Sequence, residues 1–238
     1  MAVEFQSLYS LIRDMVRIIR GSVETQSETI SDWQVEFWIH QYRAQLIKQD
    51  LDKGKSPNPD YIQEITGLKL SPVNSTELSN IKTNKYLLRT DLQIPKTLDL
   101  NHSNAIMYVG TMEGREIQLV PQGRNRWHQY KNYTNTDPIC YLKNQYLYIS
   151  SGDVIQYLDI RGVFEIPPEV SNFINPVTGL TTYDVEEDKY PIPTNWLPTL
   201  KQMILQKEFG VMVGSGSDII NDGSNSLLHG GTTEKGSK

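Results

Sequence analysis

The residues best suited to do chemistry are four carboxylates in one short segment, Asp184, Glu186, Glu187 and Asp188. Paired carboxylates can act as acid and base in hydrolysis, and their oxygens also bind divalent cations. The segment lacks the glycine and the ligand spacing of a calcium loop, and such charge runs usually form a solvated surface. We therefore predict an exposed acidic loop. The enzymatic alternative is a hydrolase that uses Asp184 or Glu187 in a pocket with a second carboxylate nearby.

The other reactive side chains form no catalytic or metal-binding pattern. His40, His102, His128 and His229 are scattered without the close spacing of zinc ligands. Cys140 lies between hydrophobic residues on a predicted strand, which favours a small buried side chain over a nucleophile. No glycine loop leads into a Lys-Ser/Thr pair, so a nucleotide site is not expected. The prediction is a non-enzymatic protein with no catalytic residues, metal or cofactor.

One segment, residues 122–130, mixes basic and aromatic side chains as nucleic-acid-binding surfaces do. Arg124, Arg126 and Trp127 are its candidates for contact with DNA or a partner. The alternative is an exposed loop with ordinary hydrogen bonds. A net charge of −5 argues against a general affinity for nucleic-acid phosphates, so any DNA contact is expected to be local and transient.

Composition also bounds the setting in which the protein works. A single cysteine excludes an internal disulfide framework, and the sequence begins at Met1 without a basic segment leading into an apolar core. These features predict synthesis and assembly in a reducing cytoplasm. The apolar runs are too short to span a bilayer, so a membrane role is not expected.

The elements that would position these groups begin with a helix over residues 31–51. Ser31 followed by Gln34 is a capping-box pattern, and Gly54 supplies a stop signal. At helical spacing, the apolar residues fall on two sides. One stripe consists of Val35, Ile39, Tyr42 and Leu46, with Trp38 at its edge, and the second flank consists of Phe37, Ala44, Ile47 and Leu51. Periodicity does not decide whether the second flank meets a larger core or a second chain.

A first helix is predicted from about Phe5 to Ile19, with Gly21 as its terminator. Arg13, Arg17 and Arg20 share one side of it. That basic stripe is either a solvated face or the counterpart of an acidic neighbour or a phosphate backbone. A short polar connection to the second helix predicts an antiparallel pair.

The middle of the chain, from Thr66 to Ile166, changes to strand-like runs broken by Gly, Pro and Asn. Residues 105–120 and 139–150 each read as a hairpin, and residues 154–166 as a long strand with a bend at Gly162. A short helix is expected from Pro168 to Ile174, and a longer one from about Asn195.

The sequence after Gly214 is small and polar, which is typical of a disordered tail. Two apolar dyads, Ile219-Ile220 and Leu227-Leu228, are candidates to anchor this tail on another subunit. Together, these elements predict an α+β fold: a helical bundle from N-terminal and C-terminal helices, with a β-rich middle domain. The expected boundaries are 1–60 for the helical hairpin, 61–166 for the β-rich domain, 167–213 for the helical part that rejoins the bundle, and 214–238 for the tail.

Several segments, in order, resemble structural proteins of crAss-like and related bacteriophages of Bacteroidetes hosts. They cover most of the chain and are ISDWQVEFWIHQYRAQLIKQDLDKG, YLLRTDLQIPKTLDL, NAIMYVGTMEGREIQLVP, CYLKNQYLYI, DIRGVFEIPPEV and YPIPTNWLPTLKQMILQKEF. The resemblance implies a virion ring or collar protein at the portal-tail junction, similar in plan to the head-to-tail adaptor of short-tailed phages. Such proteins form a dodecameric ring around the DNA channel, so the implied partners are further copies, the portal, other ring or tail proteins, and passing genomic DNA.

This resemblance favours a subunit interface as the role of the second flank of the 31–51 helix. Phe37, Ala44, Ile47 and Leu51 are then expected to lose solvent exposure mainly on assembly, with Arg13, Arg17, Arg20 and the tail dyads as further interface candidates. The alternative function is a peripheral tail module that binds host glycan or protein. It predicts an exposed aromatic groove among Tyr130, Tyr133 and Tyr146.

Overall fold

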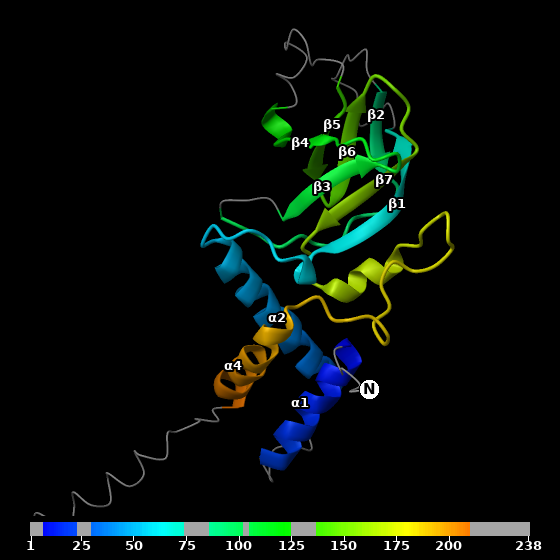
Figure 1. The fold of residues 1–238 in the computed structure, drawn as a ribbon. Helices are drawn as coiled ribbons and strands as arrows, with labels where there is room; N and C mark the ends of the chain where they lie inside the picture. Colours follow the sequence, from blue (N-terminus) through cyan, green and yellow to red (C-terminus); the bar gives the residue numbers. More distant parts are fainter. Residues whose placement is uncertain (1–6, 23–29, 74–85, 102–104, 125–136, 210–238) are drawn as a thin grey trace, which may run out of the picture.

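The computed structural model describes residues 7–22, 30–73, 86–101, 105–124 and 137–209. It places a seven-stranded sheet at one end of the molecule and the longer helices at the other (Figure 1). The long helix α2 (Asp32–Leu51) reaches from the base of the sheet to the helical end. This arrangement makes α2 the link between the two ends.

The sheet closes on itself in a barrel-like way. Its strands are β1 (Gln63–Pro72), β2 (Tyr86–Thr90), β3 (Ile106–Thr111), β4 (Gln118–Leu119), β5 (Ile139–Lys143), β6 (Tyr146–Ser151) and β7 (Tyr157–Gly162). Their order is β3-β7-β1-β2-β6-β5-β4, antiparallel throughout except for the β4–β5 pair. An antiparallel bridge between Gly110 and Glu116 joins β3 to the segment entering β4, so the two outer strands meet.

Alternating side chains explain why these segments form strands around one core. Leu68, Leu70, Leu158 and Ile160 point into a buried cluster, while Lys69 and Asp159 between them are exposed or half-buried. The two predicted hairpins are present. The β5–β6 turn holds Asn144 and Gln145 at positive φ of 51° and 63°, as a tight hairpin turn requires.

Gly67 marks an irregularity in β1 where the pairing with β7 shifts register. Its φ of +73° suits glycine, and a Cβ there would lie 2.1 Å from Cδ of Pro176. Its amide donates a hydrogen bond to Oδ1 of Asp159 at 2.9 Å. The missing side chain therefore lets a later segment of the chain pack closely on the sheet.

The helices form a small group around α2. Helices α1 (Leu8–Ser22) and α4 (Leu197–Phe209) both pack on it, and an ion pair between Asp14 and Lys201 joins them to each other. The shared core includes Leu8, Met15, Val35, Ile39 and Ile204. Short 3-10 turns occur at η2 (Pro59–Tyr61), η3 (Pro167–Asn172) and η4 (Thr194–Trp196). No helix within the described ranges is long and apolar enough to cross a membrane.

The ends of α2 agree only partly with the capping prediction. Ser31 is the N-cap residue with an extended backbone, but its side chain makes no capping bond; its carbonyl accepts from the N–H groups of Gln34 and Val35. At the other end, Gly54 has a φ of 75° and donates its N–H to the carbonyl of Leu51. The boundary prediction is thus confirmed, and the capping-box hydrogen bond is wrong.

The expected fold class is also wrong. A helical bundle carrying a β-rich domain was predicted, whereas the described chain is mostly a barrel-like seven-stranded sheet with three short-to-medium helices beside it. The reason lies in α2: its second apolar flank packs on the base of the sheet and not on further helices. Periodicity located the helices correctly, but it carried no information about which neighbour each flank would meet.

Candidate subunit interface

The second flank of α2 is for the most part already covered by the chain itself. Ile47 and Leu51 join Tyr61, Leu98 and Val163 in a buried cluster at the base of the sheet, with Ala44 partly buried against it. Ile47 is 0% exposed, so it has no surface left to lose on assembly. Burial within the subunit therefore accounts for these three apolar side chains without a neighbouring chain.

Phe37 differs from the rest of this flank, because 59% of it is exposed. Trp33 precedes it by one helical turn and is also exposed, so the two aromatic rings share one face near the start of α2. Large exposed aromatic side chains on one face are typical of protein contact surfaces. Phe37 thus remains an interface candidate, and Trp33 is a neighbour that the sequence reasoning did not select.

Arg43 is the buried link between α2 and the rest of the fold. Its Nε donates to the carbonyl of Pro191 at 2.7 Å, and its Nη1 donates to the carbonyl of Phe164 at 2.9 Å. The guanidinium also lies 5.6 Å from the ring centroid of Tyr190. Phe164 follows β7 and Pro191 precedes α4. Arg43 therefore binds α2 to both ends of the segment that connects β7 to α4. No local sequence pattern signalled the burial of Arg43.

His40 completes this buried polar network. Its Nδ1 lies 2.8 Å from the hydroxyl of Tyr190, and its Nε2 lies 3.4 Å from Oε1 of Glu36. Burial, together with the charge of Arg43, lowers the pKa of His40 to about 4. The imidazole is therefore neutral at physiological pH, and its role is a structural hydrogen bond.

The outer face of α1 carries an unpaired basic surface. Tyr9, Arg13 and Arg17 follow one another at four-residue spacing and are all exposed; we call them the basic ridge. The guanidinium of Arg13 lies 4.7 Å from the ring centroid of Tyr9. Neither arginine has a carboxylate within ion-pair distance among the residues that the structure describes. The side chain of Arg20 lies outside the described part of the chain.

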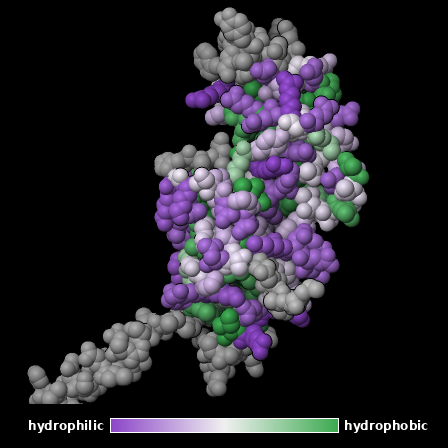
Figure 2. Space-filling model, in the orientation of Figure 1, coloured by the Kyte–Doolittle hydropathy of each residue, from purple (hydrophilic) through white to green (hydrophobic). Residues whose placement is uncertain are grey.

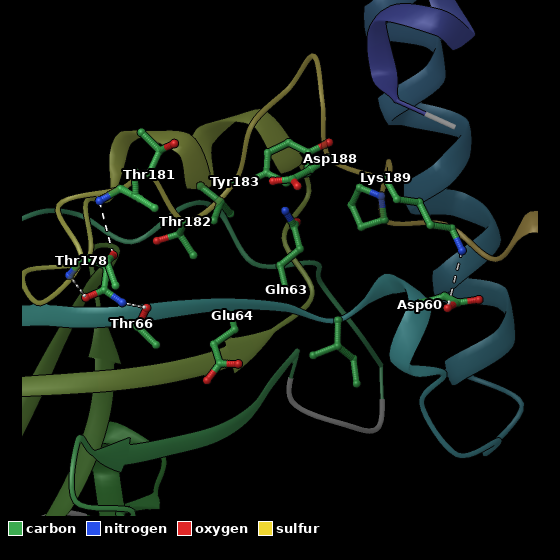
Figure 3. A pocket seen from close by; sticks show the side chains of 15 residues that line it. Asp60, Gln63, Glu64, Thr66, Thr178, Thr181, Thr182, Tyr183, Asp188 and Lys189 are labelled. Atoms are coloured by element: carbon green, nitrogen blue, oxygen red, sulfur yellow. Dashed lines mark hydrogen bonds and ion pairs between the residues drawn. The ribbon is translucent and has the colours of Figure 1, made fainter. Parts of the chain in front are cut away.

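A groove of about 590 Å³ lies between β1 and the segment that returns from η3 (Figure 3). Its lining mixes apolar surface, such as that of Leu180, with polar side chains that include Asp60, Gln63, Glu64, Tyr183 and Asp188. Figure 3 shows Gln63 rising from β1 towards the segment that carries Tyr183 and Asp188. Two of its carboxylates are paired, Asp60 with Lys189 at 3.7 Å and Glu64 with Arg161 at 3.0 Å.

The acidic loop, residues 184–188, borders this groove. The N–H of Asp184 donates to Oδ2 of Asp188 at 2.7 Å, and the N–H of Glu186 donates to Oδ1 of Asp184 at 2.8 Å. Its four carboxylates are exposed, as the sequence predicted. Within the described ranges, no cluster of three or more His, Cys, Asp or Glu residues could hold a metal ion.

A hairpin that sequence analysis missed forms the other border of the groove. Ile174 and Thr181 form an antiparallel bridge, and Oδ1 of Asn175 accepts from the N–H of Val177 at 2.8 Å. The hairpin is fixed to the sheet by the close packing of Pro176 on Gly67. Val177 is 75% exposed, and Ile174 and Leu180 are exposed as well. Figure 2 shows a hydrophobic patch at the right edge of the molecule, where Figure 1 places this hairpin.

The remaining candidates are placed as follows. Arg124 is exposed just after β4, while Arg126, Trp127 and the dyads Ile219-Ile220 and Leu227-Leu228 lie outside the described residues.

Cys140 is buried, and burial raises the pKa of its thiol to about 12, which makes it a poor nucleophile. Of the predicted aromatic groove, Tyr130 and Tyr133 lie outside the described residues, and Tyr146 is half-buried with the guanidinium of Arg89 4.7 Å from its ring centroid.

The chain matches a known protein family. The family model described as phage tail ring protein 2 matches residues 10–227 of this chain. No curated protein matches the sequence. The match spans the helices, the barrel-like sheet and most of the C-terminal segment, so it concerns the chain as a whole.

Proposed function

The chain belongs to the phage tail ring protein 2 family, and from this membership we propose that it forms a connector ring at the portal-tail junction, through which genomic DNA passes during ejection. Membership itself makes the protein a structural component of a phage tail ring, which assembles with other virion proteins. The position at the portal vertex, the dodecameric stoichiometry and the passage of DNA are the proposed part. The observation that carries the proposal is the match over residues 10–227.

The architecture supports a ring subunit. A ring subunit transmits load between neighbours, so it benefits from being one rigid body. Arg43 and the cluster around Ile47 fix the helical end to the barrel-like sheet through buried hydrogen bonds and apolar contacts. Exposed surfaces of different chemistry, the basic ridge on one side and the acidic loop elsewhere, suit the head-to-tail contacts that close a cycle.

The charge of the chain is compatible with a conduit. DNA slides freely only if few phosphates are neutralised by lysine and arginine, because each such contact adds affinity. The net charge of −5 keeps that general affinity low. Contacts such as the one proposed for Arg124 would then be local.

Imaging of intact virions tests the proposal. A fusion of a small folded tag after Lys238 should place extra density in a twelvefold ring between the portal and the tail. A phage that lacks the protein should package DNA but release it prematurely, which nuclease sensitivity of the particles would reveal. Tag density on peripheral fibres, or normal DNA retention without the protein, would contradict the proposal.

A further inference from the structure

We infer that the groove and acidic loop of one subunit receive the basic ridge of α1 from the next copy of this chain in the ring. The inference rests on the proposed function in one respect, the assembly of identical copies side by side. It adds which surfaces meet. Both surfaces lie on the described part of the chain, and each is exposed in the single subunit.

The first argument is charge. The acidic loop presents Asp184, Glu186, Glu187 and Asp188, and none of them has an ion-pair partner among the residues that the structure describes. The ridge presents two arginines that are likewise unpaired within those residues. Some other exposed charges, such as those of Lys55 and Lys96, are paired within the subunit, and isolated ones such as Lys53 and Glu113 are not paired within the described residues. The ridge and the loop differ from these isolated charges in gathering charges of one sign. The two unpaired surfaces have opposite sign, and opposite charges across an interface steer association and fix its register.

The second argument is the polar lining of the groove. Oε1 of Gln63 and the hydroxyl of Tyr183 have no hydrogen-bond partner among the described residues, although the two residues are only 7% and 6% exposed. Buried polar atoms without partners are costly, so their presence points to a group that completes the site. Burial raises the pKa of Tyr183 to about 12, so its hydroxyl stays neutral and can accept a hydrogen bond.

A guanidinium fits this lining better than other groups do. It offers five N–H donors in a planar fork and no acceptor, while the groove offers a carbonyl, a hydroxyl and carboxylates. The two unpaired oxygens are buried, so the Gln63 or Tyr183 side chain would have to rotate to present its acceptor to an arriving arginine. A purely apolar ligand would leave both groups unpaired, and an anion could pair only with the Tyr183 hydroxyl, which can also donate.

The third argument is the apolar border. Leu180 lines the groove and is exposed, and the exposed Val177 lies on the same hairpin. On the ridge, the half-exposed ring of Tyr9 precedes the two arginines by one and two helical turns. The ring of Tyr9 could therefore pack on the aliphatic border of the groove while the two arginines of the ridge face the carboxylates of the acidic loop. Because the two surfaces differ, the contact is heterologous and propagates from copy to copy until the ring closes.

Charge reversal in matched variants tests this contact. Arg13→Glu/Arg17→Glu reverses the charge of the ridge from +2 to −2, and Glu186→Lys/Glu187→Lys changes the charge of the loop from −4 to 0 without touching Asp184 and Asp188, the carboxylates that brace it. The ridge variant alone opposes like charges, and the loop variant alone removes the net attraction and sets two lysines against the arginines. For each we expect at least a tenfold rise in the concentration needed for ring formation, measured by native mass spectrometry. Lys53→Glu/Arg115→Glu changes the net charge by the same amount as the ridge variant at other exposed positions and should assemble like the wild type.

Complementation provides the decisive readout. An equimolar mixture of the two reversed variants should form rings in which they alternate, and a chain carrying all four substitutions should form rings alone. Circular dichroism checks that each variant is folded. Normal rings from the single-surface variants, or folded variants that fail to complement, would overturn the inference and leave the proposed ring intact. A wild-type chain that stays monomeric at every concentration would instead contradict the proposed function and the inference with it.

Discussion

The second apolar flank of α2 is buried at one end of the helix and exposed at the other. Near its C-terminal end, Ile47 and Leu51 are enclosed by the base of the sheet, whereas near its N-terminal end Trp33 and Phe37 face outward. The difference comes from neighbours that are remote in sequence, such as Leu98 and Val163, which cover one end only. On this flank the C-terminal end of α2 therefore packs inside the subunit and the N-terminal end is exposed, whereas Val35 and Ile39 on the opposite stripe are buried in the helical core. The exposed part of the flank is available for contacts between subunits.

The largest loss of stability is expected from Arg43→Ala, which removes the buried link between α2 and the sheet. The substitution leaves the carbonyls of Phe164 and Pro191 without their donor in a buried site and opens a cavity. We expect a loss of about 3–5 kcal/mol in the free energy of unfolding, measured by urea denaturation. Arg17→Ala on the exposed face of α1 is the control and should change it by less than about 0.5 kcal/mol. A small effect at Arg43 would show that the two ends are not held together through this side chain.

The next effect is expected at the enclosed end of α2. Ile47→Ala removes buried methyl and methylene groups, which should cost about 2–5 kcal/mol of unfolding free energy. Ile47→Asp, which buries an unpaired charge, should prevent folding. A soluble, folded Ile47→Asp subunit that fails only in assembly would place this position at an interface instead.

The third prediction uses the pH dependence of His40. Its pKa falls from 6.5 to about 4 on folding, so between these values the unfolded chain binds more protons than the folded chain. The stability that comes from keeping His40 neutral is complete above pH 6.5. It should be lost as the pH falls towards 4, which lowers the free energy of unfolding by about 3 kcal/mol in total. Urea denaturation at several pH values measures it. In His40→Gln this part of the pH dependence should disappear, and an unchanged profile would contradict a buried neutral imidazole.

The smallest effect on folding is expected at the exposed end. Phe37→Ser should change the free energy of unfolding by less than about 0.5 kcal/mol, because the ring is largely exposed in the subunit. If this face meets a neighbour, the same substitution should weaken ring formation, which sedimentation velocity would detect. A stability loss comparable to that of Ile47→Ala would remove the contrast between the two ends.

Sequence patterns predicted local structure well and long-range packing poorly. The end of α2 at Leu51 with Gly54 following, the hairpin around Asn144 and the burial of Cys140 all depend on short segments, and all are confirmed. The burial of Ile47 and Arg43 depends on partners more than fifty residues away, which periodicity does not identify. The 174–181 hairpin was not predicted, because the segment contains Pro176 and Gly179 and has little alternation.

The candidate site shows the same division. The acidic loop and the arginine stripe were visible as charge runs on separate segments. Their lack of ion-pair partners within the described ranges emerged only from the fold, as did the unpaired lining at Gln63 and Tyr183. Polarity can be read from sequence, whereas satisfaction of polar groups depends on three-dimensional neighbours.

Native mass spectrometry of the purified chain over a range of concentrations tests the central claim most directly. A connector ring predicts one closed species of twelve copies in equilibrium with folded monomer, and no ladder of open intermediates that grows without limit. A monomer at all concentrations, or an open-ended series of oligomers, would contradict the account.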